Sequence, residues 1–294
     1  MNKSLAGILV VDKPSGMTSH DVVQRVRRVA ATRKVGHAGT LDPLATGVLL
    51  VCVGQATRLL EYLVGRPKRY VATVRLGQET DTYDAEGEVV AERPFSHVSR
   101  EAIEKILPQF RGEIQQRPPA YSAIKQGGQP LYKLARQGVE VERPLRTVTI
   151  YQLDLLDWNP PYLKLDITCS SGTYIRSLAH DFGQVLACGG HITSLQRTAV
   201  GEFTRQQAVP LAQITAESLP NLLLPARNAV AHLPQLFVTT AEATQLRLGQ
   251  RIERQAEHPH AEEIAAFDSE NRFIGILVAR DKAWQPRKIF NGEL

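Results

Sequence analysis

The sequence predicts an α+β protein built from two domains. The chain has 294 residues, and because domains average roughly 150 residues, its length suggests about two of them. Short apolar stretches typical of strands are mixed with amphipathic stretches typical of helices as far as about residue 211. Residues 212–235 then place several prolines between short apolar pieces, and mostly short strands follow. We therefore expect a large domain over 1–235, ending in a connector at about 212–235, and a small β-rich domain over 236–294.

The composition narrows the class of protein. Hydrophobic residues make up 43% and charged residues 22%, so the chain can build hydrophobic cores. The net charge of +5 fits a polyanionic partner such as nucleic acid. Three cysteines without C-x-x-C spacing argue against a disulfide framework and a zinc ribbon, and they predict a reducing, cytoplasmic location. No run approaches the ~18 apolar residues of a membrane span, so we expect no membrane partner.

The first quarter of the chain reads as strand, helix, loop and strand. Residues 7–11 (GILVV) form a short buried strand that a Lys-Pro-Ser-Gly turn ends. A helix follows, because Thr18 and Asp21 have capping-box spacing and the next valines form one apolar stripe. Residues 33–47 (RKVGHAGTLDPLATG) have no helical or strand period, so we expect a loop. The loop leads into a continuous apolar strand at 47–54, an arrangement typical of functional sites.

The rest of the chain continues the mixed pattern. We expect helices at 55–64, 100–110 and 172–186, and strands at 68–77, 147–158, 162–172 and 192–203. Residues 80–90 predict a turn and a return strand. Residues 115–138 are rich in Pro, Gly and basic residues, and they predict an irregular insertion. Near the C-terminus, the DSEN sequence at 268–271 lies between two apolar runs and predicts a hairpin.

The candidate site is the stretch from His37 to Gly47. Asp42 precedes a proline and has glycines on both sides, so its carboxylate sits on a stiff, irregular backbone with little bulk around it. A substrate could approach such a carboxylate, and carboxylates act as nucleophiles in glycosidic chemistry. The alternative is that Asp42 only caps a turn.

Several motifs that occur in order resemble one family. They are GxxxxxKPxGMTSxD, RKVGHAGTLDPLATGVLLV, KRYVATVRLGxxTDTYDAEG, SGTYIRSLAxDxG and LQRTAVGEF. Between about residues 7 and 205 the chain resembles the bacterial tRNA pseudouridine synthase B (TruB) family, and its tail is similar to a small RNA-binding, PUA-like domain. The resemblance implies a pseudouridine synthase fold with a mixed, largely antiparallel sheet, and a PUA-like domain over 236–294. The composition of the segment at about 115–145 suits an RNA-contacting insertion, and an ordinary loop would have about the same composition.

The resemblance also implies an activity. Members of the family are isomerases that convert uridine 55 in the T-loop of tRNA to pseudouridine. They break the N1–C1′ glycosidic bond, turn the flipped uracil and rejoin it through C5, without a cofactor or a metal. The expected partner is therefore tRNA, bound through its T-stem-loop, and the expected state is a cytoplasmic monomer.

Three residues match the catalytic positions of the family. Asp42 matches the nucleophilic aspartate, and Arg176 matches the arginine that pairs with it. A guanidinium can hold both the charge and the orientation of a carboxylate. Tyr70 matches the tyrosine that stacks on the target base and is the proposed acceptor of the C5 proton. A phenol is a poor base at its ordinary pKa near 10, so stacking is the safer assignment. Attack of Asp42 on C1′, attack on C6 and a glycal route all stay open.

Further residues match substrate-binding positions. His37 corresponds to a histidine that fills space around the flipped nucleotides, and Tyr174 and Leu195 correspond to pocket positions. Asp21 could have a supporting electrostatic role, or it could serve only the capping box. Five basic residues surround the motifs and are candidates for contacts with tRNA phosphates: Lys13, Arg33, Lys34, Lys68 and Arg69.

Other functions remain to be weighed. A non-catalytic RNA-binding factor would not need Asp42, Tyr70 and Arg176 in combination. A glycoside hydrolase or N-glycosidase that used Asp42 would need a second carboxylate in the pocket as an acid. None is found near the motif, because Asp81 and Asp84 are expected to be turn residues. A synthase that acts on another RNA would carry the same motifs.

Overall fold

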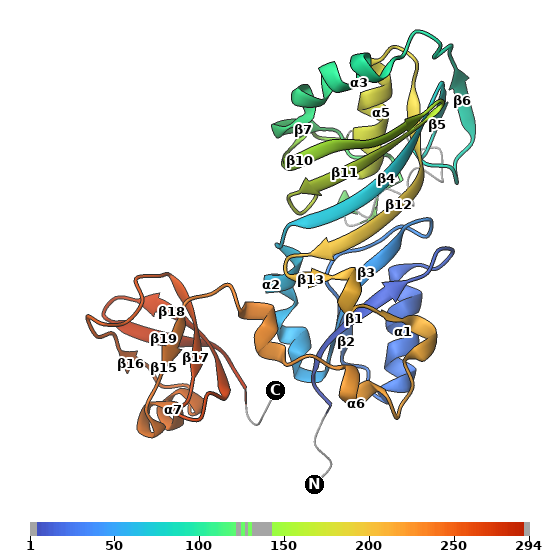
Figure 1. Cartoon of the computed structure of the whole chain (residues 1–294). Helices are drawn as coiled ribbons and strands as arrows, with labels where there is room; N and C mark the ends of the chain where they lie inside the picture. The colour runs from blue at the N-terminus through green and yellow to red at the C-terminus, as the bar shows by residue number, and fades with distance from the viewer. Residues whose placement is uncertain (1–4, 122–124, 127–128, 131–142, 291–294) are drawn as a thin grey trace.

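The computed structural model describes residues 5–121, 125–126, 129–130 and 143–290. It shows an α+β protein with a large body, built around a long twisted sheet, and a smaller body at its side (Figure 1). The predicted fold class is confirmed. The predicted insertion at about 115–145 lies mostly outside the described residues.

The large sheet runs through the whole of the larger body. Its pairing is antiparallel except for two parallel neighbours, β1 with β14 and β3 with β12. The mixed, largely antiparallel sheet implied by the resemblance is therefore confirmed. In spatial order the main strands are β14 (Val209–Pro210), β1 (Gly7–Lys13), β3 (Thr46–Val53), β12 (Gly190–Val200), β4 (Lys68–Leu76), β11 (Tyr162–Cys169), β10 (Arg146–Asn159) and β7 (Gly112–Gln116), with β2 (Val35–His37) on β3 and β13 (Phe203–Thr204) on β12.

The helices follow the local signals of the sequence. α1 (Ser19–Val29) begins with the predicted capping box between Thr18 and Asp21, and it lies against the β1–β3 part of the sheet (Figure 1). α3 (Arg100–Ile106) and α5 (Ile175–Val185) cover the other part. The predicted helix at 55–64 opens as a 3-10 turn, η1 (Gly54–Leu59), before α2 (Leu60–Val64).

Two local expectations need correction or detail. Residues 35–37, expected in the loop, form strand β2, which pairs with Val51–Val53. Three residues are too few to show a strand period, so only the tertiary pairing reveals β2. Residues 80–90 form a turn between β5 (Gln78–Thr80) and β6 (Val89–Glu92), as predicted. The short strands β8 (Lys125–Gln126) and β9 (Gln129–Pro130) form a further antiparallel pair.

The two halves of the large sheet are joined by a very short pairing of strands β3 and β12, which we call the seam. Here Gln196 pairs with Thr46 and Arg197 pairs with Gly47, and no other residues of the two strands pair. On one side of the seam lie β1, β2 and β3, and on the other lie β12, β4, β11 and β10 (Figure 1). At Gly47 the φ angle is +96°, and a Cβ there would lie 2.2 Å from the carbonyl oxygen of Arg197. Only glycine lets the two strands come this close.

The smaller body follows a connector of short helical turns. The connector contains η4 (Leu211–Gln213), α6 (Leu219–Leu222) and η5 (Ala226–Val230). The predicted hairpin at 268–271 joins β17 to β18. The second sheet has the order β15 (Gln235–Phe237), β17 (Glu263–Phe267), β18 (Phe273–Arg280), β19 (Ala283–Ile289) and β16 (Ile252–Glu253), and α7 (Thr240–Arg247) accompanies it.

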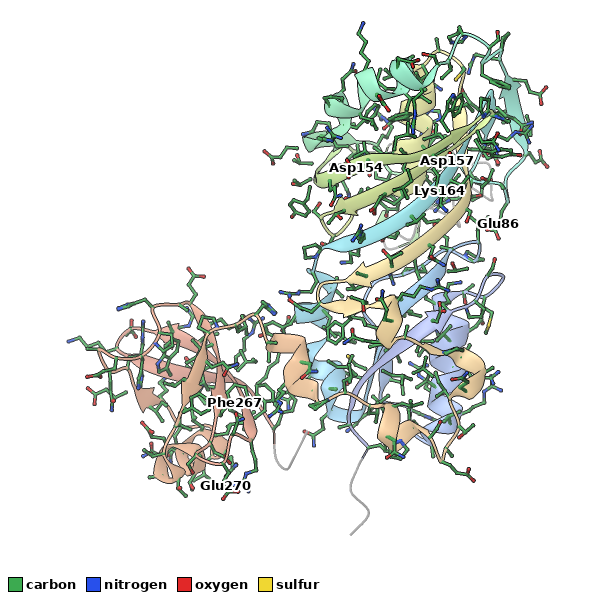
Figure 2. All side chains as sticks on the ribbon, in the orientation of Figure 1. Glu86, Asp154, Asp157, Lys164, Phe267 and Glu270 are labelled. Atoms are coloured by element: carbon green, nitrogen blue, oxygen red, sulfur yellow. The ribbon has the colours of Figure 1, made fainter. Side chains whose placement is uncertain are left out.

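The two bodies share one hydrophobic cluster. Phe267 and Phe290 of the smaller body belong to the same buried cluster as Leu59 and Leu63 of η1 and α2, and Phe267 is labelled in Figure 2. The hydroxyl of Tyr62 also donates to Glu263 at 2.6 Å across this contact. The smaller body therefore packs directly on η1 and α2. Within the described chain, we find no helix with the length and apolar character needed to cross a membrane.

Candidate active site

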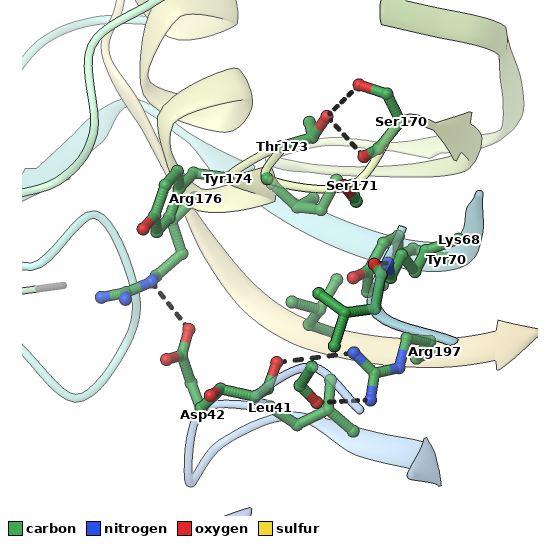
Figure 3. Close-up of a pocket in the computed structure, with 16 residues that line it drawn as sticks. Leu41, Asp42, Lys68, Tyr70, Ser170, Ser171, Thr173, Tyr174, Arg176 and Arg197 are labelled. Carbon is green, nitrogen blue, oxygen red and sulfur yellow. Dashed lines mark hydrogen bonds and ion pairs between the residues drawn. The ribbon is translucent and has the colours of Figure 1, made fainter. Parts of the chain in front are cut away.

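A cavity of about 360 Å³ opens at the seam of the large sheet (Figure 3). Its walls come from the loop after β2, from the end of α2, from β4 and β12, and from the start of α5. The structure thus brings together residues from both sides of the seam. The lining residues include Asp42, Tyr70, Tyr174, Arg176, Leu195 and Arg197.

The loop that carries Asp42 is held by the first residue of α1 and by the turn before it. The hydroxyl of Ser19 donates to the carbonyl of Leu41 at 3.0 Å and accepts from the amide of Leu41 at 2.8 Å. The amide of Gly16 donates to the carbonyl of Pro43 at 2.9 Å. Gly39 has a φ angle of +95°, which turns the chain into the loop. The backbone on both sides of Asp42 is therefore fixed.

Arg176 is the cation beside Asp42. Its Nε lies 3.0 Å from Oδ2 of Asp42, and its side chain is only 7% exposed. Its Nη1 donates to Oδ2 of Asp84 and to the carbonyl of Thr82, both at 3.1 Å. Its Nη2 donates to the carbonyl of Tyr121 at 2.9 Å. One guanidinium thus connects α5, the Asp42 loop, the turn after β5 and the start of the insertion.

Opposing influences act on the carboxyl group of Asp42. Burial raises the pKa of Asp42, and the nearby carboxylate of Asp84 raises it further, whereas Arg176 and Lys13 lower it. The side chain is 37% exposed toward the cavity, while that of Asp84 is 3% exposed. Asp42 is therefore the carboxylate of the pair that a bound molecule can reach.

Tyr70 forms part of the opposite wall. It lies on β4, is buried, and lines the cavity. Burial raises the pKa of its phenol, and the guanidinium of Arg197 partly opposes this shift. At neutral pH the phenol is therefore protonated, which suits a stacking surface better than a base.

Tyr174 and Leu195, which the resemblance assigns to pocket positions, also line the cavity. Tyr174 is the residue before α5, and Gln116 fixes its backbone through two hydrogen bonds. The Gln116 side chain donates to the Tyr174 carbonyl at 2.9 Å and accepts from its amide at 2.8 Å. Leu195 projects from β12 and is nearly buried. These two residues give the cavity one polar aromatic wall and one apolar wall.

His37 and Asp21 lie outside the cavity lining. His37 is in β2, and burial lowers the pKa of its imidazole. Asp21 accepts hydrogen bonds from the amide and the hydroxyl of Thr18 at 2.9 and 2.6 Å. The capping-box alternative for Asp21 is thus realised. A contact of either residue with substrate stays a prediction.

Lys13 and Lys68 are buried and bound to backbone, so their expected contacts with phosphates stay a prediction. Lys13 is 1% exposed, and its Nζ donates to the carbonyls of Pro14, Met17 and Pro43. Lys68 is 6% exposed, and its Nζ donates to the carbonyls of Val64 and Arg66. Desolvation lowers the pKa of each to about 8. Both lysines support backbone at the site, whereas Arg33, Lys34 and Arg69 are exposed.

The sequence predicts that Asp84 is a turn residue, and the structure adds a second contact. Asp84 is also a buried carboxylate on Arg176. It also accepts from the hydroxyl of Thr82 at 2.7 Å and from the amide of Glu86 at 3.1 Å, so its turn role is real as well. Local sequence could not show that the turn after β5 folds against α5.

Arg197 was missed altogether. It is 1% exposed and lines the cavity. The signal was available, because residues two apart on a strand share a face. Leu195 and Arg197 are two apart on β12, as Lys68 and Tyr70 are on β4. Once Leu195 and Tyr70 are assigned to the pocket, strand alternation assigns Arg197 and Lys68 to it too.

Comparisons with known proteins agree on one family. Residues 27–175 match the family model "TruB family pseudouridylate synthase (N terminal domain)", and residues 176–231 match "tRNA pseudouridylate synthase B C-terminal domain". Proteins named tRNA pseudouridine synthase B are 42% identical in Haemophilus influenzae (strain 86-028NP) and 45% identical in Pseudomonas aeruginosa (strain UCBPP-PA14). Each alignment covers 98% of this chain, with 96% and 97% of the relative.

Solved structures share the fold. The protein in "Crystal Structure of a Cbf5-Nop10-Gar1 Complex" is 26% identical, with a TM-score of 0.74 over 97% of this chain and 85% of that chain. The one in "Structure of H/ACA RNP bound to a substrate RNA containing 2'-deoxyuridine" is 23% identical, with a TM-score of 0.75 over the same shares. At that identity the second likeness shows the fold alone.

Proposed function

Because the chain belongs to the TruB family of pseudouridylate synthases, and is therefore an isomerase, we propose that it converts uridine 55 in the T-loop of tRNA to pseudouridine. The tRNA substrate is supported by the names of relatives that align over nearly the full chain. The choice of position 55 is supported by the motifs around Asp42, Tyr70 and Arg176. We further propose that the enzyme acts in the cytoplasm as a monomer.

The observation that carries the proposed mechanism is the ion pair of Asp42. The carboxylate faces the cavity, and the Nε of the buried Arg176 lies 3.0 Å from its Oδ2. The reaction breaks the N1–C1′ bond, turns the uracil and forms a C5–C1′ bond. C5 loses a proton and N1 gains one, so the product has the formula of the substrate. Attack on C1′, attack on C6 and a glycal route all require Asp42 to be ionised, and Arg176 favours that form.

The site suits a single extruded nucleoside. A uridine within a folded loop must leave its stack before its glycosidic bond can be reached. The aromatic face of Tyr70 and the apolar side chain of Leu195 offer contacts for the flipped base. The exposed Arg33, Lys34 and Arg69 are candidates for contacts with phosphates, which would make binding depend on salt.

A glycosidase is the main chemical rival, and the position of Asp84 bears on it. Such an enzyme needs a second carboxylate that reaches the substrate as an acid. Asp84 does not line the cavity, and its oxygens are engaged by Arg176, Thr82 and Glu86. Burial and the charges of Asp84 and Asp42 raise the pKa of Glu86, but this carboxylate also stays outside the cavity lining. Among the described residues, the lining therefore supplies no second carboxylate to act as the acid of a glycosidase.

The test uses a T-stem-loop RNA that carries the target uridine, with a matched RNA that has cytidine at that position. We expect the wild type to form pseudouridine in the first RNA, with no free uracil. Asp42→Asn should lower the rate by at least about 10³-fold, because removal of a nucleophile disables the chemical step. Binding should stay within about twofold. Turnover by Asp42→Asn, release of uracil, or modification at another uridine would contradict the proposal.

A further inference from the structure

Arg197 crosses the seam of the large sheet with its side chain. It belongs to β12, but all three of its guanidinium nitrogens donate to carbonyls on the far side of the seam. Nε donates to Val48 at 2.7 Å, Nη2 to Gly39 at 3.1 Å and Nη1 to Thr40 at 3.4 Å. Figure 3 shows the guanidinium against the loop that leads to Asp42.

The same residue neighbours Tyr70. In the antiparallel pairing of β12 with β4, Arg197 lies directly opposite Tyr70, and side chains opposite one another project from the same face of the sheet. Arg197 therefore contacts the Asp42 loop on one side and the strand of Tyr70 on the other.

The charge of Arg197 is unusual for its position. Within the described residues its hydrogen-bond partners are three carbonyl oxygens and the phenol of Tyr70, rather than a carboxylate. A buried cation of this kind is costly to stability, because carbonyl dipoles replace only part of its hydration. An apolar residue would fill the seam at lower cost, so packing alone does not account for an arginine here.

We propose that Arg197 is a positioning residue, which sets where the Asp42 carboxylate lies relative to the ring of Tyr70 by tying their two halves of the sheet together. This inference rests on the proposed function. Asp42 and Tyr70 come from opposite sides of a seam that has only two backbone pairs. The fork of Arg197 adds two bonds to the loop before Asp42, at Gly39 and Thr40, and one to Val48 of β3. Misplacement of a reacting group by about 1 Å can slow a reaction about 10²-fold.

The main test is Arg197→Lys, which keeps the charge but cannot reach three carbonyls at once. We expect its single-turnover rate on the T-stem-loop RNA to fall about 100-fold, with the Kd for that RNA within about twofold of wild type. A 2-aminopurine next to the target uridine should report unchanged base flipping. The matched control is Arg111→Lys, since Arg111 also holds a carbonyl, that of Leu153 at 2.7 Å, away from the cavity. Its rate should equal that of the wild type.

A second variant and a second measurement keep the result decisive. Arg197→Gln removes the buried charge, so it should fold even if the lysine variant does not, and it should be at least as slow. Hydrogen exchange of amides 39–47 should be about tenfold faster in either variant, a readout that does not depend on the reaction. Wild-type rates in a folded variant, equal losses of rate and flipping, or unchanged exchange would overturn the role of Arg197. An inactive wild type with faster exchange in the variants would instead overturn the proposed function alone.

Discussion

Asp84 influences the reactive carboxylate without facing the cavity. Burial and the charge of Asp84 both raise the pKa of Asp42 above its ordinary value of 3.8. The ionised form is then lost as pH falls through this raised pKa, so the reaction rate should drop on the acid side earlier than a free aspartate would predict. The charge of Asp84 thus affects the pKa of Asp42, and this effect can be tested separately from the contact of Asp84 with Arg176.

The variant Asp84→Asn tests that effect. It keeps the shape and an acceptor for Arg176 but removes the negative charge, so the pKa of Asp42 should fall. We expect the acid limb of the single-turnover pH–rate profile to move to lower pH, whatever happens to the plateau. An acid limb that stays in place, or that moves to higher pH, would refute the electrostatic link between the two carboxylates.

At the scale of elements, the sequence predicted what local signals encode. The helix α1 could be found because Thr18 and Asp21 cap it and its valines form a stripe, and the β17–β18 hairpin could be found from its turn. Strand β2, the contact of Asp84 with Arg176 and the seam depend on pairing between distant segments. No local pattern encodes such pairing. The site residues Asp42, Tyr70 and Arg176 were found because each matches a position with a known role in the family. Arg197 lies in the motif LQRTAVGEF, but neither the motif nor the strand pattern was used to assign it a role.

Two buried lysines make the stability of the folded protein depend on pH. The pKa values of Lys13 and Lys68 are lowered from 10.5 to about 8 in the folded protein. Between about pH 8 and 10.5 the unfolded chain therefore binds more protons than the folded one, and stability rises with pH in that window. Lys68→Met should reduce this rise, as measured by urea unfolding at several pH values. The control Lys164→Met, on the exposed side of β11 (Figure 2), should leave the slope unchanged. Equal slopes in all three proteins would contradict this origin.

For the whole molecule, the contact between the two bodies combines a buried apolar cluster with polar pairs around it. Phe290 is 1% exposed within the shared cluster. Phe290→Ala should lower the free energy of unfolding by about 3–5 kcal/mol, as for other buried phenylalanines. Glu61→Gln should cost less than about 1 kcal/mol, because its ion pairs with Arg287 and Lys288 are largely exposed. Calorimetry and denaturant unfolding measure both. Similar losses in the two variants would show that polar contacts dominate this interface.

The position of Phe290 in that cluster bears on how the protein is made. Its partners, Leu59 and Leu63, leave the ribosome long before it does, and a nascent chain folds from its N-terminal end. Residues of β1, β3 and the connector belong to the same cluster and are made earlier. Until β19 has been synthesised, the part of the cluster that Phe290 covers is therefore exposed to water.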